Sequence, residues 1–425
     1  MQKILFILVI TTTLIFATDW TNWKGPNGNL TTDESDWDAM SISDPDILWE
    51  ANLGKGHAAF AITEEYLFTT GNHQVITANV GSFQVGQTPG MKQDTLYEDV
   101  VYCLDAETGE EIWTYSYPCK HRDWPGPRTT PVLDGDLLFI LSWEGHLFCF
   151  DANSGDVIWK KHLVNDGLSQ ENSWGFAGSP VVDGEMLLLT ANKNGVALNK
   201  KTGNVIWKSE PGICGLTTPI IFDYNGKKAA VIPEEKIMHI VDILNGDILL
   251  SHDYKTCNDP VIFDNKIYFS AEHNRGHSTM YEFSGDTLKM VWQNNKIIKG
   301  WAFMNHAIKD GFTYAIGHYK GKHHLHCVEL ATGELKWVQR VGDRWGSNII
   351  AGDKLIILNG EGKLIIAETN PEAYTEIAST QILEMADNTG VQEPWQCACW
   401  TMPVLSNGKL YVRDNYGKTV CLNVE

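Results

Sequence analysis

The chain has 425 residues, of which 43% are hydrophobic and 20% charged, proportions that suit a globular protein with a substantial core. Its 53 acidic residues outnumber its 33 basic residues, which gives a formal net charge of −20. A surface this acidic repels phosphate backbones, so the composition argues against nucleic-acid binding and against purely electrostatic docking onto anionic lipid.

The first residues, MQKILFILVITTTLIFATDW, have the features of a secretory signal peptide. Lys3 provides a small positive region, an apolar stretch begins at Ile4, and Ala17 is a small residue suited to cleavage. Because the stretch is short and rich in threonine for a membrane span, we interpret residues 1–17 as a cleaved signal peptide, with an uncleaved anchor as the alternative. No cysteine stands near residue 18, so lipid attachment is not predicted. We expect a periplasmic or extracellular protein with no transmembrane segment after signal removal.

A repeat dominates the rest of the chain. It consists of an apolar strand, a turn centred on Thr-Gly or Ser-Gly, and a second strand with a tryptophan four residues after the glycine. Four segments show it in full: CLDAETGEEIWTYSY from Cys103, CFDANSGDVIWKKHL from Cys149, ALNKKTGNVIWKSEP from Ala197 and CVELATGELKWVQRV from Cys327. Each glycine stands where a hairpin turn needs a positive φ, and Asp105 and Asp151 can accept hydrogen bonds from the turn's backbone N–H groups.

Less regular copies extend the series to eight positions. The tryptophan position is filled, in chain order, by Trp49, Trp113, Trp159, Trp207, Leu250, Trp292, Trp337 and Ile377. The successive gaps of 64, 46, 48, 43, 42, 45 and 40 residues match the period of a four-stranded propeller blade. The long first gap indicates an extended loop over residues 79–98.

The two ends of the chain each supply half of a unit. In complete units, a proline such as Pro131 opens an inner strand, which an Asp-Gly turn joins to the next strand. The last such half ends at Glu425 without a tryptophan strand, whereas the first tryptophan strand, over residues 46–53, has no preceding half. Joining the two closes the ring and removes exposed sheet edges. We therefore predict an all-β, eight-bladed β-propeller of four-stranded antiparallel blades over residues 46–425, preceded by a leader over residues 18–45.

These repeats resemble the quinoprotein-type, or tryptophan-docking, PQQ-like propeller repeat, A-x-D-x-x-T-G-x-x-x-W. The resemblance covers nearly all of the chain after the signal, and DWTNWKGPNG at residues 19–28 is similar to the leader of secreted bacterial proteins of this group. In this family the tryptophan packs between neighbouring blades. Two related groups are the PQQ-dependent alcohol dehydrogenases and the propeller lipoprotein of the outer-membrane β-barrel assembly machinery, which binds protein partners and no cofactor.

The resemblance to the dehydrogenases suggests an enzyme, whereas the resemblance to the assembly-machinery propeller suggests a scaffold protein. The dehydrogenases imply PQQ with Ca²⁺, an aspartate base and, in many members, an adjacent Cys-Cys disulfide. This sequence has no Cys-Cys pair, the nearest approach being Cys397-Ala398-Cys399. We therefore predict a monomeric, non-enzymatic binding or scaffold protein for a protein or small-molecule ligand, with no cofactor assigned. The alternative is a PQQ-dependent, alcohol dehydrogenase-like oxidoreductase with PQQ and Ca²⁺, and a third interpretation is a carbohydrate-binding module.

The ligand site is predicted at the mouth of the central channel, where the loops that precede the inner strands converge. The candidate residues are mostly aromatic, with a few basic and amide groups: His57, Trp124, Arg128, Trp174, Asn258, Trp301, Asn305, Trp345 and Trp400. Such a ring suits an anionic or sugar-like ligand or a peptide. The alternative is that the aromatic residues fill the channel and that Arg128 pairs with a carboxylate. No catalytic residue is predicted.

The nine cysteines fall into two sets. One set shares a repeat position in different blades and is predicted to be buried core: Cys103, Cys149, Cys327 and Cys421. The other set lies in loops before inner strands, where a disulfide, or a thiolate metal site with His57, is an alternative: Cys119, Cys214, Cys257, Cys397 and Cys399. His324 and His326 share a strand face and could form a two-ligand site, but we interpret their segment as an exposed hairpin. No metal site is predicted.

Overall fold

The computed structural model describes residues 18–75, 96–119, 126–172, 174–234, 236–253, 258–270, 277–294, 306–319, 322–384 and 399–425. In these residues the regular structure is β-strand, apart from one 3-10 turn, η1 (Ser41–Ser43). Within these residues no helix has the length and apolar character needed to cross a membrane. The predicted signal peptide, residues 1–17, lies outside the described residues.

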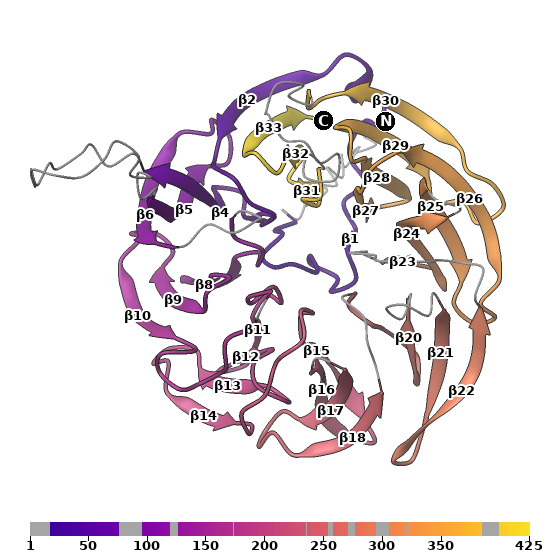
Figure 1. Ribbon diagram of the computed structural model, residues 1–425. Coiled ribbons are helices and arrows are strands. Elements are labelled where there is room, and N and C mark those ends of the chain that lie inside the picture. Colours follow the sequence, from indigo (N-terminus) through magenta and orange to yellow (C-terminus); the bar gives the residue numbers. More distant parts are fainter. Residues whose placement is uncertain are drawn as a thin grey trace, which may run out of the picture.

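Eight sheets are arranged around a central axis, each with an inner strand near the axis and an outer strand at the rim (Figure 1). Seven of them use consecutive strands. Three come from the first half of the chain: β3 (Ala61–Ile62), β4 (Tyr66–Val75), β5 (Leu96–Asp105) and β6 (Glu111–Pro118); β7 (Val132–Asp134), β8 (Leu137–Leu141), β9 (His146–Asp151) and β10 (Val157–His162); β11 (Val181–Asp183), β12 (Met186–Leu189), β13 (Val196–Asn199) and β14 (Val205–Lys208). Four follow: β15 (Ile220–Tyr224), β16 (Lys227–Pro233), β17 (Ile237–Asp242) and β18 (Ile248–Asp253); β19 (Val261–Phe263), β20 (Lys266–Phe269), β21 (Ser278–Ser284) and β22 (Thr287–Asn294); β23 (Ala307–Lys309), β24 (Phe312–Tyr319), β25 (Lys322–Glu329) and β26 (Leu335–Gly342); β27 (Ser347–Ala351), β28 (Lys354–Leu358), β29 (Lys363–Glu368) and β30 (Glu376–Gln381).

The eighth sheet, which we call the closing blade, joins the two ends of the chain. It contains β31 (Val404–Ser406), β32 (Lys409–Arg413) and β33 (Lys418–Asn423), with β2 (Asp46–Asn52) as its outer strand. Strand β2 runs antiparallel to β33, from Asp46 opposite Asn423 to Asn52 opposite Lys418. Figure 1 shows the indigo β2 beside the yellow β33. The predicted eight-bladed propeller, closed by the N-terminal strand, is confirmed.

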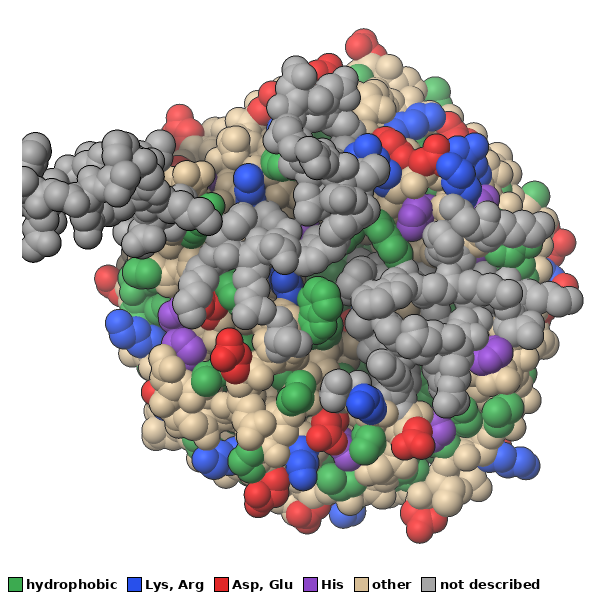
Figure 2. Space-filling model, viewed as in Figure 1, with side chains coloured by type: hydrophobic (Ala, Val, Ile, Leu, Met, Phe, Trp, Pro, Cys, Tyr) green, Lys and Arg blue, Asp and Glu red, His purple; other side chains and the backbone are tan. Residues whose placement is uncertain are grey.

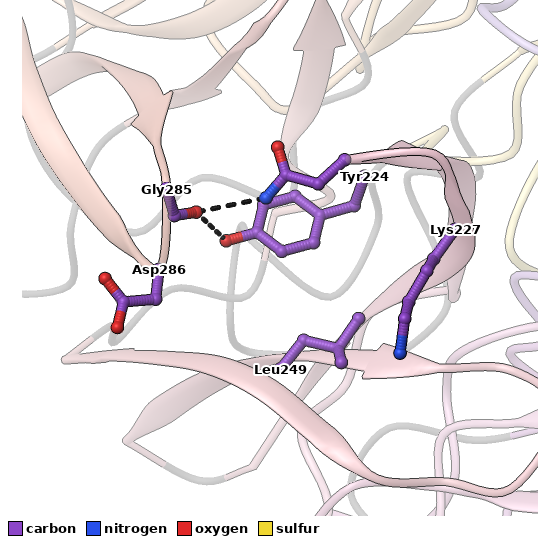
Figure 3. A pocket seen from close by; sticks show the side chains of 6 residues that line it. Tyr224, Lys227, Leu249, Gly285 and Asp286 are labelled. Carbon is purple, nitrogen blue, oxygen red and sulfur yellow. Dashed lines mark hydrogen bonds between the residues drawn. The ribbon is translucent and has the colours of Figure 1, made fainter.

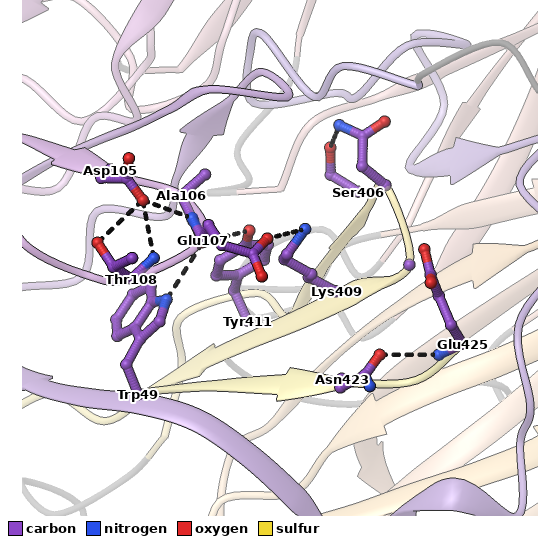
Figure 4. Close-up of polar contacts among 12 residues, drawn as sticks. Trp49, Asp105, Ala106, Glu107, Thr108, Ser406, Lys409, Tyr411, Asn423 and Glu425 are labelled. Carbon is purple, nitrogen blue, oxygen red and sulfur yellow. Dashed lines mark hydrogen bonds and ion pairs between the residues drawn. The ribbon is translucent and has the colours of Figure 1, made fainter.

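The repeat residues join each blade to the next. Asp105 Oδ1 accepts a hydrogen bond from the backbone N–H of Thr108 at 2.8 Å, as predicted for this turn. The Trp49 indole N–H donates to the carbonyl of Ala106 at 3.2 Å (Figure 4). Its ring lies over Gly109, where φ is +72° and an added Cβ would come within 2.6 Å of the indole. The glycine is therefore required both for its positive φ and for its lack of a side chain.

The same indole-to-carbonyl hydrogen bond recurs around the ring. Five further pairs have it: Trp113 with Ala152, Trp159 with Lys200, Trp207 with Ile243, Trp292 with Leu330 and Trp337 with Asn370. At the closing blade, Lys409 adds an ion pair with Glu107 at 2.8 Å, which Figure 4 also shows. Each contact joins one blade to the turn of the following blade.

Every outer strand has a β-bulge immediately before the tryptophan position. In β30 the residue at this position is Ala378, paired with Ile366, and Ile377 is the extra residue of the bulge. The sequence-based assignment of Ile377 was therefore wrong by one residue, because this degenerate segment lacks the Thr-Gly turn from which to count. In four other blades the bulged residue is exposed; Ile158, for example, is 46% exposed. Bulges of this kind interrupt the regular edge that unpaired outer strands would otherwise present.

The leader lies against the inner strands. Trp20 exchanges two backbone hydrogen bonds with Ile62, at 2.8 and 2.7 Å. Strand β1 (Thr31–Thr32) then adds to β27 in parallel, and Glu34 accepts hydrogen bonds from the backbone N–H of Asn407 and Gly408. These contacts fall toward the ends of the inner strands, whereas Trp23 and Lys24 of the leader contact Asp259, just before β19 begins. In Figure 1 the indigo segment with β1 runs through the middle of the ring.

Candidate ligand-binding site at the channel mouth

The mouth is the end of the channel at which the inner strands begin. Six of the nine predicted residues lie in the described part of the chain: His57, Arg128, Trp174, Asn258, Trp345 and Trp400. Trp124, Trp301 and Asn305 lie outside the described residues. Figure 2 views the ring along its axis and shows hydrophobic side chains near the centre of the disc.

Four rings form a row at the mouth. The His57 ring stacks on Trp400 with 5.2 Å between centroids and 27° between planes. Trp400 meets Trp345 edge-on at 6.2 Å, and Trp345 lies 4.5 Å from the ring of His323. Since these residues come from four adjacent blades, the row depends on the order of blades in the ring. Three of its members were predicted, and His323 was missed because the sequence presents it as one of a run of histidines.

The row of rings lies beside two arginine side chains, Arg128 and Arg413. Burial, and then the charges of Arg128 and Arg413, lower the pKa of His57 to about 3, so its imidazole is neutral at ordinary pH. The Arg128 guanidinium donates a hydrogen bond to the carbonyl of Trp174, which fixes the cation at the loop before β7. Tryptophan rings and the neutral His57 next to a guanidinium can bind a flat or apolar group that carries an anion.

Arg413 is a second positive charge near the mouth, and sequence analysis missed it. The side chain is fully buried at the end of β32. Its Nη1 donates to Ala58 O, Thr69 Oγ1 and Thr70 O at 3.2, 2.9 and 3.0 Å, and its Nη2 donates to Leu53 O and Gly54 O at 3.2 and 2.8 Å. Arg413 thus binds the closing blade to the chain that leads into the first complete blade. No local motif marks it, since all its acceptors are more than 340 residues away.

Asn258 and its neighbour Asp259 are not part of the row of rings and bind polar groups instead. The Asn258 amide donates to Ser270 Oγ at 3.0 Å. Asp259 accepts from the Trp23 indole at 3.1 Å and from the backbone N–H of Thr218 at 3.0 Å, and it forms an ion pair with Lys24 at 2.6 Å. A Ca²⁺-held quinone would need a set of hard oxygen donors. Asp259, one carboxylate near the mouth that could contribute to such a set, is engaged by the leader.

The predictions for the cysteines are met in part. All four cysteines at the shared repeat position are buried, and the seven described cysteines are free thiols, so no disulfide forms among them. Cys257 and Cys397 lie outside the described residues. Within the described residues one group of three ligand-type side chains is found, Cys119 with Glu144 and His146, and this group does not include His57.

The histidine run at residues 323–326 is more buried than the exposed hairpin predicted for it. His324 and His326 do share a face, and both rings contact Tyr319, at 5.6 and 5.8 Å. However, His326 is 1% exposed, because β25 continues through the run as a central strand of its blade. Burial lowers the pKa of His326 to about 4, so it is a neutral core residue.

A pocket lies between the blade β15–β18 and the blade β19–β22. Figure 3 shows its lining, which is Tyr224, Asn225, Lys227, Leu249, Gly285 and Asp286. The carbonyl of Gly285 accepts hydrogen bonds from the Tyr224 hydroxyl at 2.6 Å and from the Asn225 amide at 3.2 Å. These groups satisfy one another across the boundary between the blades, so we interpret the pocket as part of blade packing.

Known proteins resemble this chain in repeat and fold. The family model described as outer membrane protein assembly factor BamB matches residues 97–339, more than half of the chain. The curated protein of that name from Escherichia coli (strain K12) is 27% identical over 157 residues, which cover 35% of this chain and 36% of the relative, so little more than a third of its length is matched.

Two solved structures show the same architecture. BamB from Moraxella catarrhalis aligns with a TM-score of 0.57 at 13% identity, covering 89% of this chain and 99% of that chain. A quinohemoprotein alcohol dehydrogenase from Comamonas testosteroni aligns with a TM-score of 0.67 at 12% identity, covering 95% of this chain and 80% of that chain. At these identities the likeness concerns the fold.

Proposed function

The chain belongs to the family of the outer membrane protein assembly factor BamB, and on this premise we propose that it is an exported scaffold propeller whose mouth binds a segment of a partner protein. The observation that supports this proposal best is the row of rings at His57, Trp400 and Trp345, beside the held guanidinium of Arg128. The predicted signal peptide supports placing the protein in the periplasm or outside the cell.

The chemistry of the mouth favours a particular kind of segment. Tryptophan rings give large contact area at low entropic cost, and such residues act as anchors in protein interfaces. Because His57 is neutral, the positive charge at the mouth comes from arginine, which pairs well with carboxylates. The segment we propose therefore carries an aromatic or large aliphatic side chain next to Asp, Glu or a C-terminal carboxylate.

The proposal is tested with a peptide array in which an aromatic or leucine anchor is placed beside acidic, neutral or basic residues. Trp345→Ala and Trp400→Ala are each expected to weaken binding of the acidic set by about tenfold or more, as central aromatic anchors do. Leu244→Ala is the control, since Leu244 is 73% exposed on the turn between β17 and β18. Unchanged binding in both tryptophan variants would contradict the proposal.

The alternative function is that of a PQQ-dependent oxidoreductase, which the fold of the quinohemoprotein relative suggests. Titration of the same protein with PQQ and Ca²⁺, followed by an assay of dye-linked alcohol oxidation, separates the two. Stoichiometric binding with turnover would replace the scaffold proposal. A glycan panel covers the carbohydrate-binding interpretation, which requires binding that is lost in the same tryptophan variants.

A further inference from the structure

A second cluster of ligand-type side chains lies between the blade β3–β6 and the blade β7–β10. The Cys119 sulfur, a carboxylate oxygen of Glu144 and a ring nitrogen of His146 all lie within 4.8 Å of one another. Cys119 directly follows β6, whereas Glu144 and His146 belong to the hairpin between β8 and β9. Cys119 is buried, and the other two are partly buried.

Neighbouring side chains hold the cluster in place. The Ser142 hydroxyl and His146 Nδ1 are hydrogen-bonded at 3.0 Å, and the His146 ring packs against Tyr117 at 5.1 Å. Metal-binding histidines commonly have one ring nitrogen fixed in this way while the other binds the metal. The arrangement therefore orients His146 before any ligand is present.

Asp99 is completely buried, and its carboxyl group contacts the Cys119 thiol. Its Oδ1 accepts a hydrogen bond from the Asn72 amide at 2.8 Å, and its Oδ2 accepts one from the Tyr117 hydroxyl at 3.3 Å. The Cys119 thiol thus lies within reach of two carboxyl groups, those of Asp99 and Glu144, and of the His146 imidazole.

We propose that Cys119, Glu144 and His146 bind a divalent transition metal of the zinc type, with Asp99 as a positioning residue. Thiolate, imidazole and carboxylate are the ligands that zinc takes in proteins, and the sulfur makes the set unsuitable for Ca²⁺ or Mg²⁺. When the sulfur–metal bond forms, the Cys119 thiol releases its proton to solvent. Three protein ligands leave the fourth tetrahedral position to water.

The test uses the full-length protein, stripped with a chelator and titrated with Co²⁺ as a spectroscopic substitute for zinc. One equivalent of Co²⁺ is expected to produce a thiolate-to-cobalt charge-transfer band that Zn²⁺ removes, with affinity that rises with pH because a proton is released. Cys119→Ser is expected to abolish the band. Glu144→Gln and His146→Gln are expected to weaken binding by about tenfold or more.

A matched control comes from another blade, where His239 and Glu234 form a similar pair, 3.3 Å apart, without a thiol. His239→Gln should leave the cobalt band unchanged. Asp99→Asn should keep the band but shift the pH dependence of binding, which a purely structural role would not do. Absence of the band in the unmodified protein, or its persistence in a folded Cys119→Ser variant, would overturn the proposal.

Discussion

At the outer rim, most blades present a tryptophan in the same register, whereas at the mouth the side chains differ more from blade to blade. Trp159 lies over Gly203 of the next blade just as Trp113 lies over Gly155. At the mouth, by contrast, His57 and Trp400 occupy corresponding places in neighbouring blades and have different chemistry.

This difference reflects what each region must satisfy. Each rim contact joins two units of the same design, so the same indole, carbonyl and glycine serve every boundary at which they occur. The contacts at the mouth do not repeat from blade to blade in this way, so we infer that its residues are less constrained by blade packing and can differ to match a ligand. Variants at the rim should therefore lower stability, whereas variants at the mouth should lower binding.

The largest effect is expected at the rim of the closing blade. Deletion of residues 46–54 removes β2, including Trp49, and exposes β33 as an unpaired edge. We expect loss of the cooperative thermal transition, as followed by circular dichroism and by calorimetry. An unchanged transition would show that β2 does not close the ring.

Arg413 lies inside the ring, between the rim and the mouth. It tests whether contacts at this depth also stabilise the packing of the closing blade on the first complete blade. Arg413→Met removes all five hydrogen bonds of the guanidinium and leaves buried carbonyls without a donor. We expect the free energy of unfolding to fall by about 3–5 kcal/mol, measured by urea denaturation. Arg340→Met, at an exposed ion pair with Asp343, should change it by less than about 1 kcal/mol.

The sequence revealed those features that recur along it. Trp159 and Gly203 could be predicted because both belong to one period, and the split blade followed from counting its halves. The bulge that places Ala378 rather than Ile377 opposite Ile366 adds a residue that a degenerate segment does not reveal. Contacts such as Glu34 with Gly408, or Cys119 with His146, depend on which blades become neighbours, and no local pattern encodes that.

His306, a buried histidine directly before β23, makes the stability of the protein depend on pH. Burial lowers the pKa of His306 to about 3, whereas in the unfolded chain a histidine has a pKa of about 6.5. Between pH 6.5 and pH 3 the unfolded state binds a proton that the folded state does not. The contribution of neutral His306 to the free energy of unfolding is therefore fully present above pH 6.5 and declines as the pH falls toward 3.

The destabilisation caused by His306→Gln should therefore shrink by about 2 kcal/mol between about pH 7.5 and about pH 5. Urea denaturation of both proteins at each pH measures this difference and cancels the contribution of other groups, including Asp99, whose pKa burial raises to about 6. A destabilisation that is independent of pH would show that His306 is not held in its neutral form.

The smallest effect separates the indole hydrogen bond from the packing of its ring. Trp159→Phe keeps an aromatic ring over Gly203 but removes the N–H that donates to Lys200 O at 2.9 Å. We expect a loss of about 1 kcal/mol in the free energy of unfolding, the usual contribution of one hydrogen bond. Trp345→Phe at the mouth should change stability by less than about 0.5 kcal/mol while it weakens peptide binding. Equal losses of stability in the two variants would mean that the mouth, like the rim, is part of what holds the blades together.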